Sequence, residues 1–250
     1  MLSWNIFKRA ALLVIDNLGA ALRLSVVPYG LLVVASFYFI GSLDVTSWQV
    51  QLEVGPEEMP NLPDGFLGGV LALSLVQLGV YIWIAIAWHR YILLQEGGEG
   101  WLPSLSTELF VGYLWRLILL ILVMVAVLIA VTLALTIPLP VVGIPVSIIL
   151  GILIFYRLGL VLPAVAVGNP MTLPEAWAAT KGQSGTVITL AVLSFVLSLL
   201  FELPALVGGA DPSGLVSMVY NLVVGWFLIL LGVSVLSTLY GHFVEGRSVE

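Results

Sequence analysis

The stretch Leu109–Ile137, LFVGYLWRLILLILVMVAVLIAVTLALTI, decides the fold class of this chain. Its single charged residue is Arg116, and from Leu117 to Leu135 every residue is apolar except Thr132. An α-helix rises ~1.5 Å per residue and the hydrocarbon core of a bilayer is ~30 Å thick, so about 20 apolar residues suffice to cross it. A helix that is apolar on all sides would need complete burial in a soluble protein. The stretch is therefore predicted to be a transmembrane helix.

The composition of the whole chain agrees with this interpretation. Of the 250 residues 61% are hydrophobic and 9% are charged, whereas soluble domains carry roughly 25% charged residues. The chain has no cysteine, which excludes disulfides, thiolate nucleophiles, iron–sulfur clusters and zinc–cysteine sites. Its 8 Lys and Arg residues are scattered, which excludes a basic patch for nucleic acid. We therefore expect membrane lipids as partners and no nucleic acid.

Five further apolar segments are long enough to cross a bilayer, which predicts an all-α protein with one integral membrane domain over 1–250. The six predicted spans are approximately 24–42, 66–88, 109–137, 146–167, 186–203 and 215–240. Between the first two lies an outer loop, 43–65, which has acidic residues and no basic one. Within it Thr46–Val54 alternates apolar and polar residues, which is typical of a short strand, and the prolines that follow favour irregular structure.

Residues 1–22 are predicted to form an amphipathic helix that lies in the membrane interface. Apolar residues recur at helical spacing on one side: Trp4, Phe7, Ala11, Val14, Ile15, Leu18 and Leu22. Polar residues fall on the other side: Asn5, Arg9, Asp16 and Arg23. Lys8 and Arg9 would then lie near anionic headgroups. A signal peptide is the competing interpretation, but Asp16 and Asn17 interrupt the apolar run and no small-residue cleavage site follows.

The basic residues predict the orientation of the six spans. Successive loops alternate between the two sides of the membrane, and all the basic residues lie on one side or nearest to it: Lys8, Arg9, Arg23, Arg90, Arg116, Arg157, Lys181 and Arg247. The loops of the other side contain none. Because cytoplasmic loops carry the excess of Lys and Arg, both termini are expected in the cytoplasm.

Arg157, within the fourth predicted span, is the most unusual residue, because a charged side chain inside the bilayer costs ~2.5–3.5 kcal/mol unless it pairs or reaches water. Three interpretations stay open: a side chain that snorkels to the surface, an ion pair with Glu175 or Glu108, or a contact with a substrate or lipid headgroup. Pro163 would end or kink the helix and bring Arg157 nearer to water. Glu175 lies in the first turn of a predicted short helix with Thr172 as its N-cap residue.

Gln77 and Asn221 lie inside the second and sixth predicted spans. Hydrogen bonding between helices is the default role for such amides and contributes ~0.6 kcal/mol each. A cavity lined by Gln77, Tyr81, Arg157 and Asn221 would instead indicate a transporter. No span carries an Asp, Glu or Lys at its middle, which argues against an ion-coupled pump.

His89 and His242 follow the second and sixth predicted spans. The two side chains would ligate a haem or a pigment if those helices were neighbours, although anchoring at the membrane interface is the preferred interpretation. No catalytic residue, metal site or cofactor is predicted, because the chain has 2 His and no Cys and lacks a phosphate-binding loop or a hydrolase motif.

Two neighbouring motifs carry a resemblance to a known family. Arg157-Leu-Gly-Leu-Val-Leu-Pro163 is followed by Leu173-Pro-Glu175-Ala-Trp177-Ala-Ala-Thr180-Lys181-Gly182. This combination resembles uncharacterised bacterial inner-membrane proteins and the membrane domain attached to some glycerophosphodiester phosphodiesterases. The resemblance implies the six-span architecture and a location in the cytoplasmic (inner) membrane of a bacterium, and it favours a pairing of Arg157 with Glu175. It implies no phosphodiesterase activity, because the motifs lie in the membrane part and the catalytic domain has no counterpart here.

Together these observations favour a non-enzymatic integral membrane protein that acts through helix and lipid contacts. We expect it to be a subunit or assembly partner of a larger membrane complex, with membrane lipids and other membrane protein subunits as partners. The alternative is a transporter or channel for a small neutral or lipidic substrate.

Overall fold

The computed structural model describes residues 2–42, 65–96, 100–207 and 214–249. In this part of the chain every regular element is a helix, and six helices are long and apolar enough to cross a membrane. These are α2 (Leu18–Ser42), α4 (Phe66–Leu94), α5 (Thr107–Val131) with its π-helical extension η1 (Thr132–Thr136), α6 (Pro140–Leu158) continued by α7 (Val161–Ala166), α9 (Ser184–Val207) and α10 (Leu215–Phe243). The predicted helical architecture with six candidate spans is thus confirmed.

Two shorter helices complete the described elements: α1 (Leu2–Ile15) precedes α2, and α8 (Leu173–Ala179) lies between α7 and α9. The predicted outer loop 43–65, with its predicted strand, lies outside the described residues except for Gly65.

Several helices extend beyond the bounds that the sequence suggests. α1 ends at Ile15 and α2 begins at Leu18, with Asp16 and Asn17 in the turn between them, so residues 18–22, which were predicted as part of the interfacial helix, belong to α2. α4 continues to Leu94, since its aromatic and basic residues near the end leave the backbone hydrogen bonding intact. α6 begins at Pro140 rather than near residue 146, because proline is well suited to the first helical position, where no backbone N–H is required.

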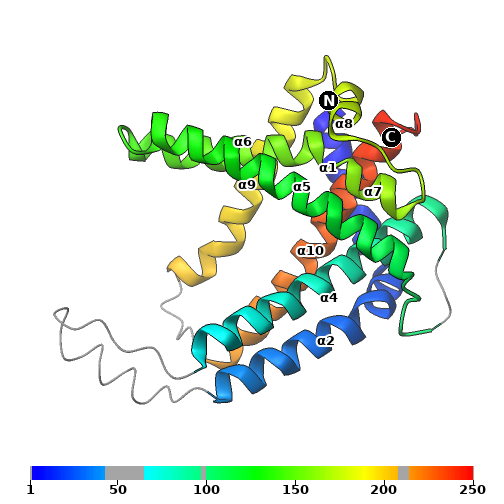
Figure 1. The fold of residues 1–250 in the computed structure, drawn as a ribbon, viewed down its shortest axis with the longest axis vertical. Helices are drawn as coiled ribbons and strands as arrows, with labels where there is room; N and C mark the ends of the chain where they lie inside the picture. The colour runs from blue at the N-terminus through cyan, green and yellow to red at the C-terminus, as the bar shows by residue number, and fades with distance from the viewer. Residues whose placement is uncertain (1, 43–64, 97–99, 208–213, 250) are drawn as a thin grey trace.

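Two groups of helices extend from one common end of the molecule (Figure 1). In one group α4 packs against α2 and α10, and in the other α6 packs against α5 and α9. α1 and α7 join the groups, since α1 contacts α2, α9 and α10 while α7 contacts α4, α5 and α10. Both termini and α8 also lie at this end. We call it the core end, defined by α1, α7 and α8.

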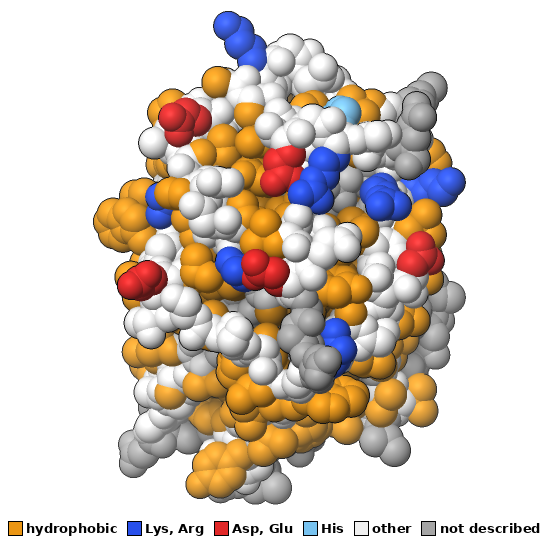
Figure 2. All heavy atoms as spheres, turned by 90° about the vertical axis from the view of Figure 1, so that its right-hand side faces the viewer, with side chains coloured by type: hydrophobic (Ala, Val, Ile, Leu, Met, Phe, Trp, Pro, Cys, Tyr) orange, Lys and Arg blue, Asp and Glu red, His pale blue; other side chains and the backbone are white. Residues whose placement is uncertain are grey.

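Buried side chains concentrate at the core end. All the buried residues of α4 fall between Val80 and Leu93, and those of α10 begin at Leu230. The opposite halves of the long helices expose Leu and Val side chains, which suits a surrounding of lipid. Figure 2 shows acidic and basic side chains spread over the upper and middle part of one face, with hydrophobic side chains crowded below them.

The buried face of α1 only partly overlaps the apolar stripe predicted from the sequence, with Val14 common to both. Its buried residues are Ser3, Ile6, Ala10 and Val14, which pack the helix against its neighbours. Trp4 and Ile15 of the predicted stripe are 54% and 51% exposed. Contact of the exposed face of α1 with lipid headgroups stays a prediction.

α7 is a short helix of which every residue is buried. Gly159 separates it from α6, and a Cβ there would collide with the carbonyl oxygen of Phe155. The chain therefore breaks before Pro163, not at it, and Pro163 occupies the first turn of α7, where its missing N–H costs little.

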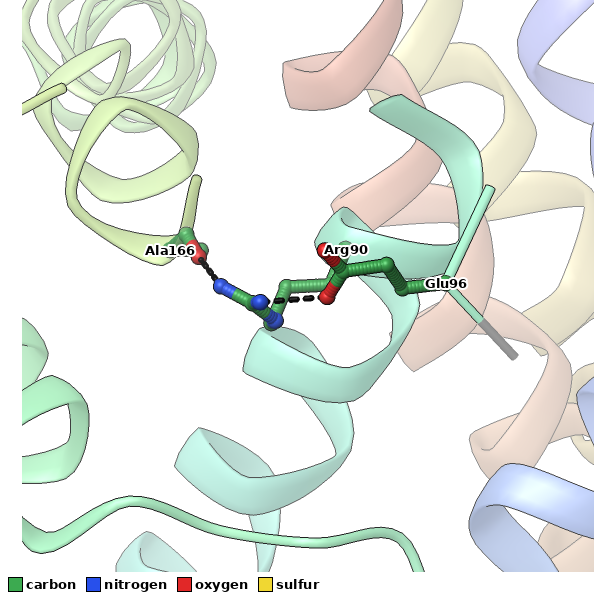
Figure 3. A network of polar contacts seen from close by, with 3 residues as sticks. All are labelled: Arg90, Glu96 and Ala166. Carbon is green, nitrogen blue, oxygen red and sulfur yellow. Dashed lines mark hydrogen bonds and ion pairs between the residues drawn. The ribbon is translucent and has the colours of Figure 1, made fainter. Parts of the chain in front are cut away.

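Arg90 of α4 caps the end of this buried helix (Figure 3). Its Nη1 donates a hydrogen bond of 2.9 Å to the carbonyl oxygen of Ala166, and its Nη2 pairs with Glu96. The last carbonyls of a helix lack partners within it and carry partial negative charge, so a guanidinium stabilises them. Arg90 thus ties α4 to α7.

The α5–α6 hairpin depends on one close backbone approach. Gly143 of α6 lies against the backbone of Thr136, where a Cβ would collide with the Thr136 main chain. Next to this contact the hydroxyls of Thr136 and Ser147 are hydrogen-bonded at 2.9 Å. The hairpin therefore requires glycine at position 143.

We predict that Gly143→Ala lowers the free energy of unfolding by about 1–3 kcal/mol, because an overpacked contact must be relieved by moving backbone. Gly232→Ala on α10 is the matched control, since a Cβ there meets no atom within 4 Å. The control should be neutral or stabilising by about 0.5–1 kcal/mol. Unfolding in mixed micelles measures both, and equal stability of the two variants would contradict the close approach.

We predict that Arg90→Met destabilises the protein by about 1.5–3 kcal/mol, because the Ala166 carbonyl loses a charged donor. Glu96→Gln removes only the exposed ion pair and should cost about 0–1 kcal/mol. The same unfolding measurement applies. A larger loss in Glu96→Gln than in Arg90→Met would mean that the ion pair, not the cap, carries the stabilisation.

Candidate functional site

A cavity of about 380 Å³ lies between α2, α4 and α10, away from the core end. Its polar lining residues are Tyr29, Ser36, Gln77, Tyr81 and Asn221. The others are apolar: Leu32, Val33, Phe37, Met218 and Leu222. We call this cavity the crevice. The structure brings together Gln77, Tyr81 and Asn221, as the transporter interpretation required, and leaves Arg157 outside.

Hydrogen bonds of the crevice leave some of its polar groups free for a ligand. Gln77 Nε2 donates to the Tyr81 hydroxyl at 2.8 Å, one turn further along α4. The Tyr29 hydroxyl donates to the carbonyl oxygen of Leu222 at 3.1 Å and so joins α2 to α10. Within the described part of the chain, the Asn221 amide makes no such bond. The Asn221 amide is therefore available to hydrogen-bond a ligand that carries a hydroxyl or ester group.

No charged side chain is among the lining residues of the crevice. An ion bound there would have no counter-charge in a surrounding of low polarity, where unpaired charges are costly. Apolar residues form half of the lining and suit a hydrocarbon portion of a ligand. The arrangement therefore fits an uncharged molecule that has both a polar and an apolar part.

Sequence reasoning missed Tyr29 and Ser36 as members of the site. The two residues lie seven positions apart in α2, which places them on one face of a helix, two turns apart. This spacing was the available signal. A single pair of polar residues on an apolar helix is common, so it indicates a binding site only once α2 is known to lie beside α4 and α10.

Arg157 lies near the core end and is 6% exposed. Its Nη2 donates to the Ser184 hydroxyl at 2.5 Å, and its guanidinium carbon lies 4.4 Å from the centroid of the Trp177 ring. The pairing with Glu175 that the resemblance favours is not formed, and none with Glu108 is seen. In the described ranges the ion pairs involve Arg90 and Arg247 instead.

Glu175 is occupied by a local role at the start of α8. Thr172 and Glu175 form a capping box, as expected for the predicted N-cap residue. The Thr172 backbone N–H donates to the Glu175 carboxylate at 2.7 Å and the Thr172 hydroxyl at 2.9 Å. These hydrogen bonds, the backbone one first, hold the pKa of the Glu175 carboxyl below its ordinary value of 4.5.

His89 is fully buried, so the interpretation as an interface anchor does not describe it. Its Nδ1 lies 2.8 Å from the Ser237 hydroxyl and its Nε2 lies 3.4 Å from the Tyr113 hydroxyl. Ser237 donates its own proton to the carbonyl oxygen of Val233, so we assign a neutral imidazole with the proton on Nδ1. Both nitrogens are engaged, which leaves neither free as a ligand.

His242 belongs to a separate set of contacts. Its Nδ1 lies 3.0 Å from the carbonyl oxygen of Arg247, in the tail that folds back beyond α10. Thus each histidine has its own hydrogen-bond partners, and they share none. No group of three or more His, Cys, Asp or Glu that would hold a metal occurs among the residues the structure describes.

We predict that Glu175→Gln weakens the first turn of α8 at neutral pH. A carboxyl whose pKa is lowered by folding stabilises the fold above its unfolded-state pKa, and this contribution is lost as the pH falls through the lowered value. Amide exchange over residues 173–179 should therefore be faster in the variant at pH 7. The difference should vanish at pH values below the folded-state pKa, and a constant difference at all pH values would contradict the capping role.

Comparison with known proteins adds no family assignment: no protein-family model, curated protein or solved structure matches this chain.

Proposed function

We propose that the protein is a non-enzymatic membrane protein that binds a neutral lipid in the crevice between α2, α4 and α10. The observation that carries the proposal is the convergence of Gln77 and Tyr81 with Asn221, from helices far apart in the sequence, on one cavity without a charged wall. This corresponds to the transport alternative for a lipidic substrate.

The polarity of the crevice supports a ligand with a hydroxyl or ester group. Inside a bilayer an amide such as that of Asn221 has no water to bond, so a polar ligand group is favoured as its partner. Pockets that hold small ligands have volumes of about 300–1,000 Å³. The crevice, of about 380 Å³, would hold the glycerol region of a diacylglycerol-like molecule while its chains remain in the membrane.

The lining residues supply no acid, no base and no activated nucleophile. General acid–base and covalent catalysis both need such groups within reach of the substrate. The chemistry of the crevice therefore supports binding or transfer of an unchanged lipid.

A second role, as subunit of a larger membrane complex, is favoured by α5. Along this helix the only residues buried by the described part of the chain are Tyr113 and Leu120. Its other faces would contact lipid or helices of another subunit. In this proposal the core end faces the cytoplasm of a bacterium, with both termini, because Lys8, Lys181 and Arg247 lie there or in the segments attached to it.

We predict that the gently extracted protein retains one neutral glycerolipid, and that Gln77→Met combined with Asn221→Leu reduces retention about tenfold. Two hydrogen bonds worth ~0.5–1.5 kcal/mol each are lost, while side-chain size is nearly kept. Native mass spectrometry measures the bound fraction.

The control is Ser74→Ala, because Ser74 lies on α4 outside the crevice and bonds the carbonyl oxygen of Val70. Equal retention by the double variant and the control would refute lipid binding in the crevice. A second polypeptide that co-elutes in fixed ratio would support the subunit role.

A further inference from the structure

The buried guanidinium of Arg157 has no counter-ion in the described part of the chain. Its side chain is 6% exposed, and its Nε is buried without any hydrogen-bond partner. Ser184 and Trp177 are its contacts, and both are neutral. A buried charge is normally paired, because its removal from water is otherwise uncompensated.

The nearest acid along α8 does not supply the missing charge. Glu175 lies two residues before Trp177, but its carboxylate turns back to the N–H and the hydroxyl of Thr172. The Glu175 carboxylate is therefore occupied by the capping box and does not pair with Arg157. The charge of Arg157 remains open for a partner from outside the chain.

The group that Arg157 contacts makes the imbalance larger. Ser184 is the first residue of α9, and the first N–H groups of a helix lack intrahelical acceptors and carry about +0.5 elementary charge. Lys181 precedes Ser184 by three residues and is exposed. Arg157 and the start of α9 thus place positive charge side by side, and Lys181 adds a cation in the connection between α8 and α9. Figure 1 shows α8 at the core end.

We propose that Arg157, the Ser184 hydroxyl and the first turn of α9 bind a phosphate group. Phosphate oxygens accept hydrogen bonds from a guanidinium and from backbone N–H groups at helix N-termini. The negative charge of the phosphate balances the positive charge of both. The Trp177 ring holds the guanidinium in place from one side. The phosphate belongs either to a lipid headgroup or to free phosphate, and this site is independent of the crevice.

The test uses the full chain, delipidated in nonionic detergent, and measures its thermal unfolding. One arm adds inorganic phosphate against chloride at equal ionic strength. The other arm adds phosphatidic acid against diacylglycerol, which lacks the phosphate. Stabilisation by inorganic phosphate assigns the free anion, and stabilisation by phosphatidic acid beyond that by diacylglycerol assigns a headgroup. Stabilisation by neither overturns the proposal.

Two variants locate the site. Arg157→Gln should weaken the apparent affinity for phosphate about tenfold or more, because a charge-assisted bond is lost. Ser184→Asp places a carboxylate beside Arg157, so it should raise the melting temperature without phosphate and abolish the response to phosphate. If Arg157→Gln does not fold, Ser184→Asp decides alone, and a wild-type response in that variant overturns the proposal.

Lys8→Gln is the matched control, since Lys8 is an exposed cation of α1 at the same end of the molecule. It should respond to phosphate as the wild-type protein does. An equal loss in Lys8→Gln would mean that phosphate acts through general screening, which also overturns the site. Binding of diacylglycerol, in contrast, reports on the crevice, so failure of one proposal leaves the other standing.

Discussion

A buried carbonyl without a donor costs about 1–3 kcal/mol, and α7 would end in such a group at the centre of the core end. Arg90 removes this cost by donating to Ala166. Since α7, together with α1, contacts helices of both groups, this bond stabilises one of the two elements that join them. Gly159 allows the turn that separates α7 from α6 and lets α7 enter the interior.

The position of the core explains why the two proposed sites differ in chemistry. At the core end helices begin and end, so charged groups such as Arg157 meet helix termini and loops. The crevice is lined by the sides of α2, α4 and α10, and its polarity comes from neutral residues such as Gln77 and Asn221. The proposed anion site and the proposed site for an uncharged molecule therefore occupy different parts of the protein.

The sequence predicted the helices better than their contacts. Hydrophobic length alone indicates six spans, because crossing a bilayer imposes that length on each segment. The convergence of Gln77, Tyr81 and Asn221 was also expected as one alternative. The hydrogen-bond partners of individual polar residues were harder to predict from the sequence, since they depend on which helices become neighbours.

Arg157 and His89 illustrate this limit. An ion pair between Arg157 and Glu175 was expected because the two side chains carry opposite charges. Instead, the Glu175 carboxylate bonds Thr172, which is only three residues away along the chain, in the capping box. His89 looked like a surface residue because it lies next to Arg90, yet α4 continues beyond it and packing against α10 buries it. A helix that is buried on one side and open on the other gives adjacent residues opposite surroundings.

The π-helical turn η1 has a further consequence for the lipid-facing surface of the hairpin. A π turn holds more residues per turn than an α turn, so it shifts the direction of every side chain that follows. Here the π turn ends at Thr136, whose hydroxyl pairs with that of Ser147 on α6. A change in the number of residues in η1 would therefore rotate Thr136 away from Ser147 and leave both hydroxyls facing lipid without a partner.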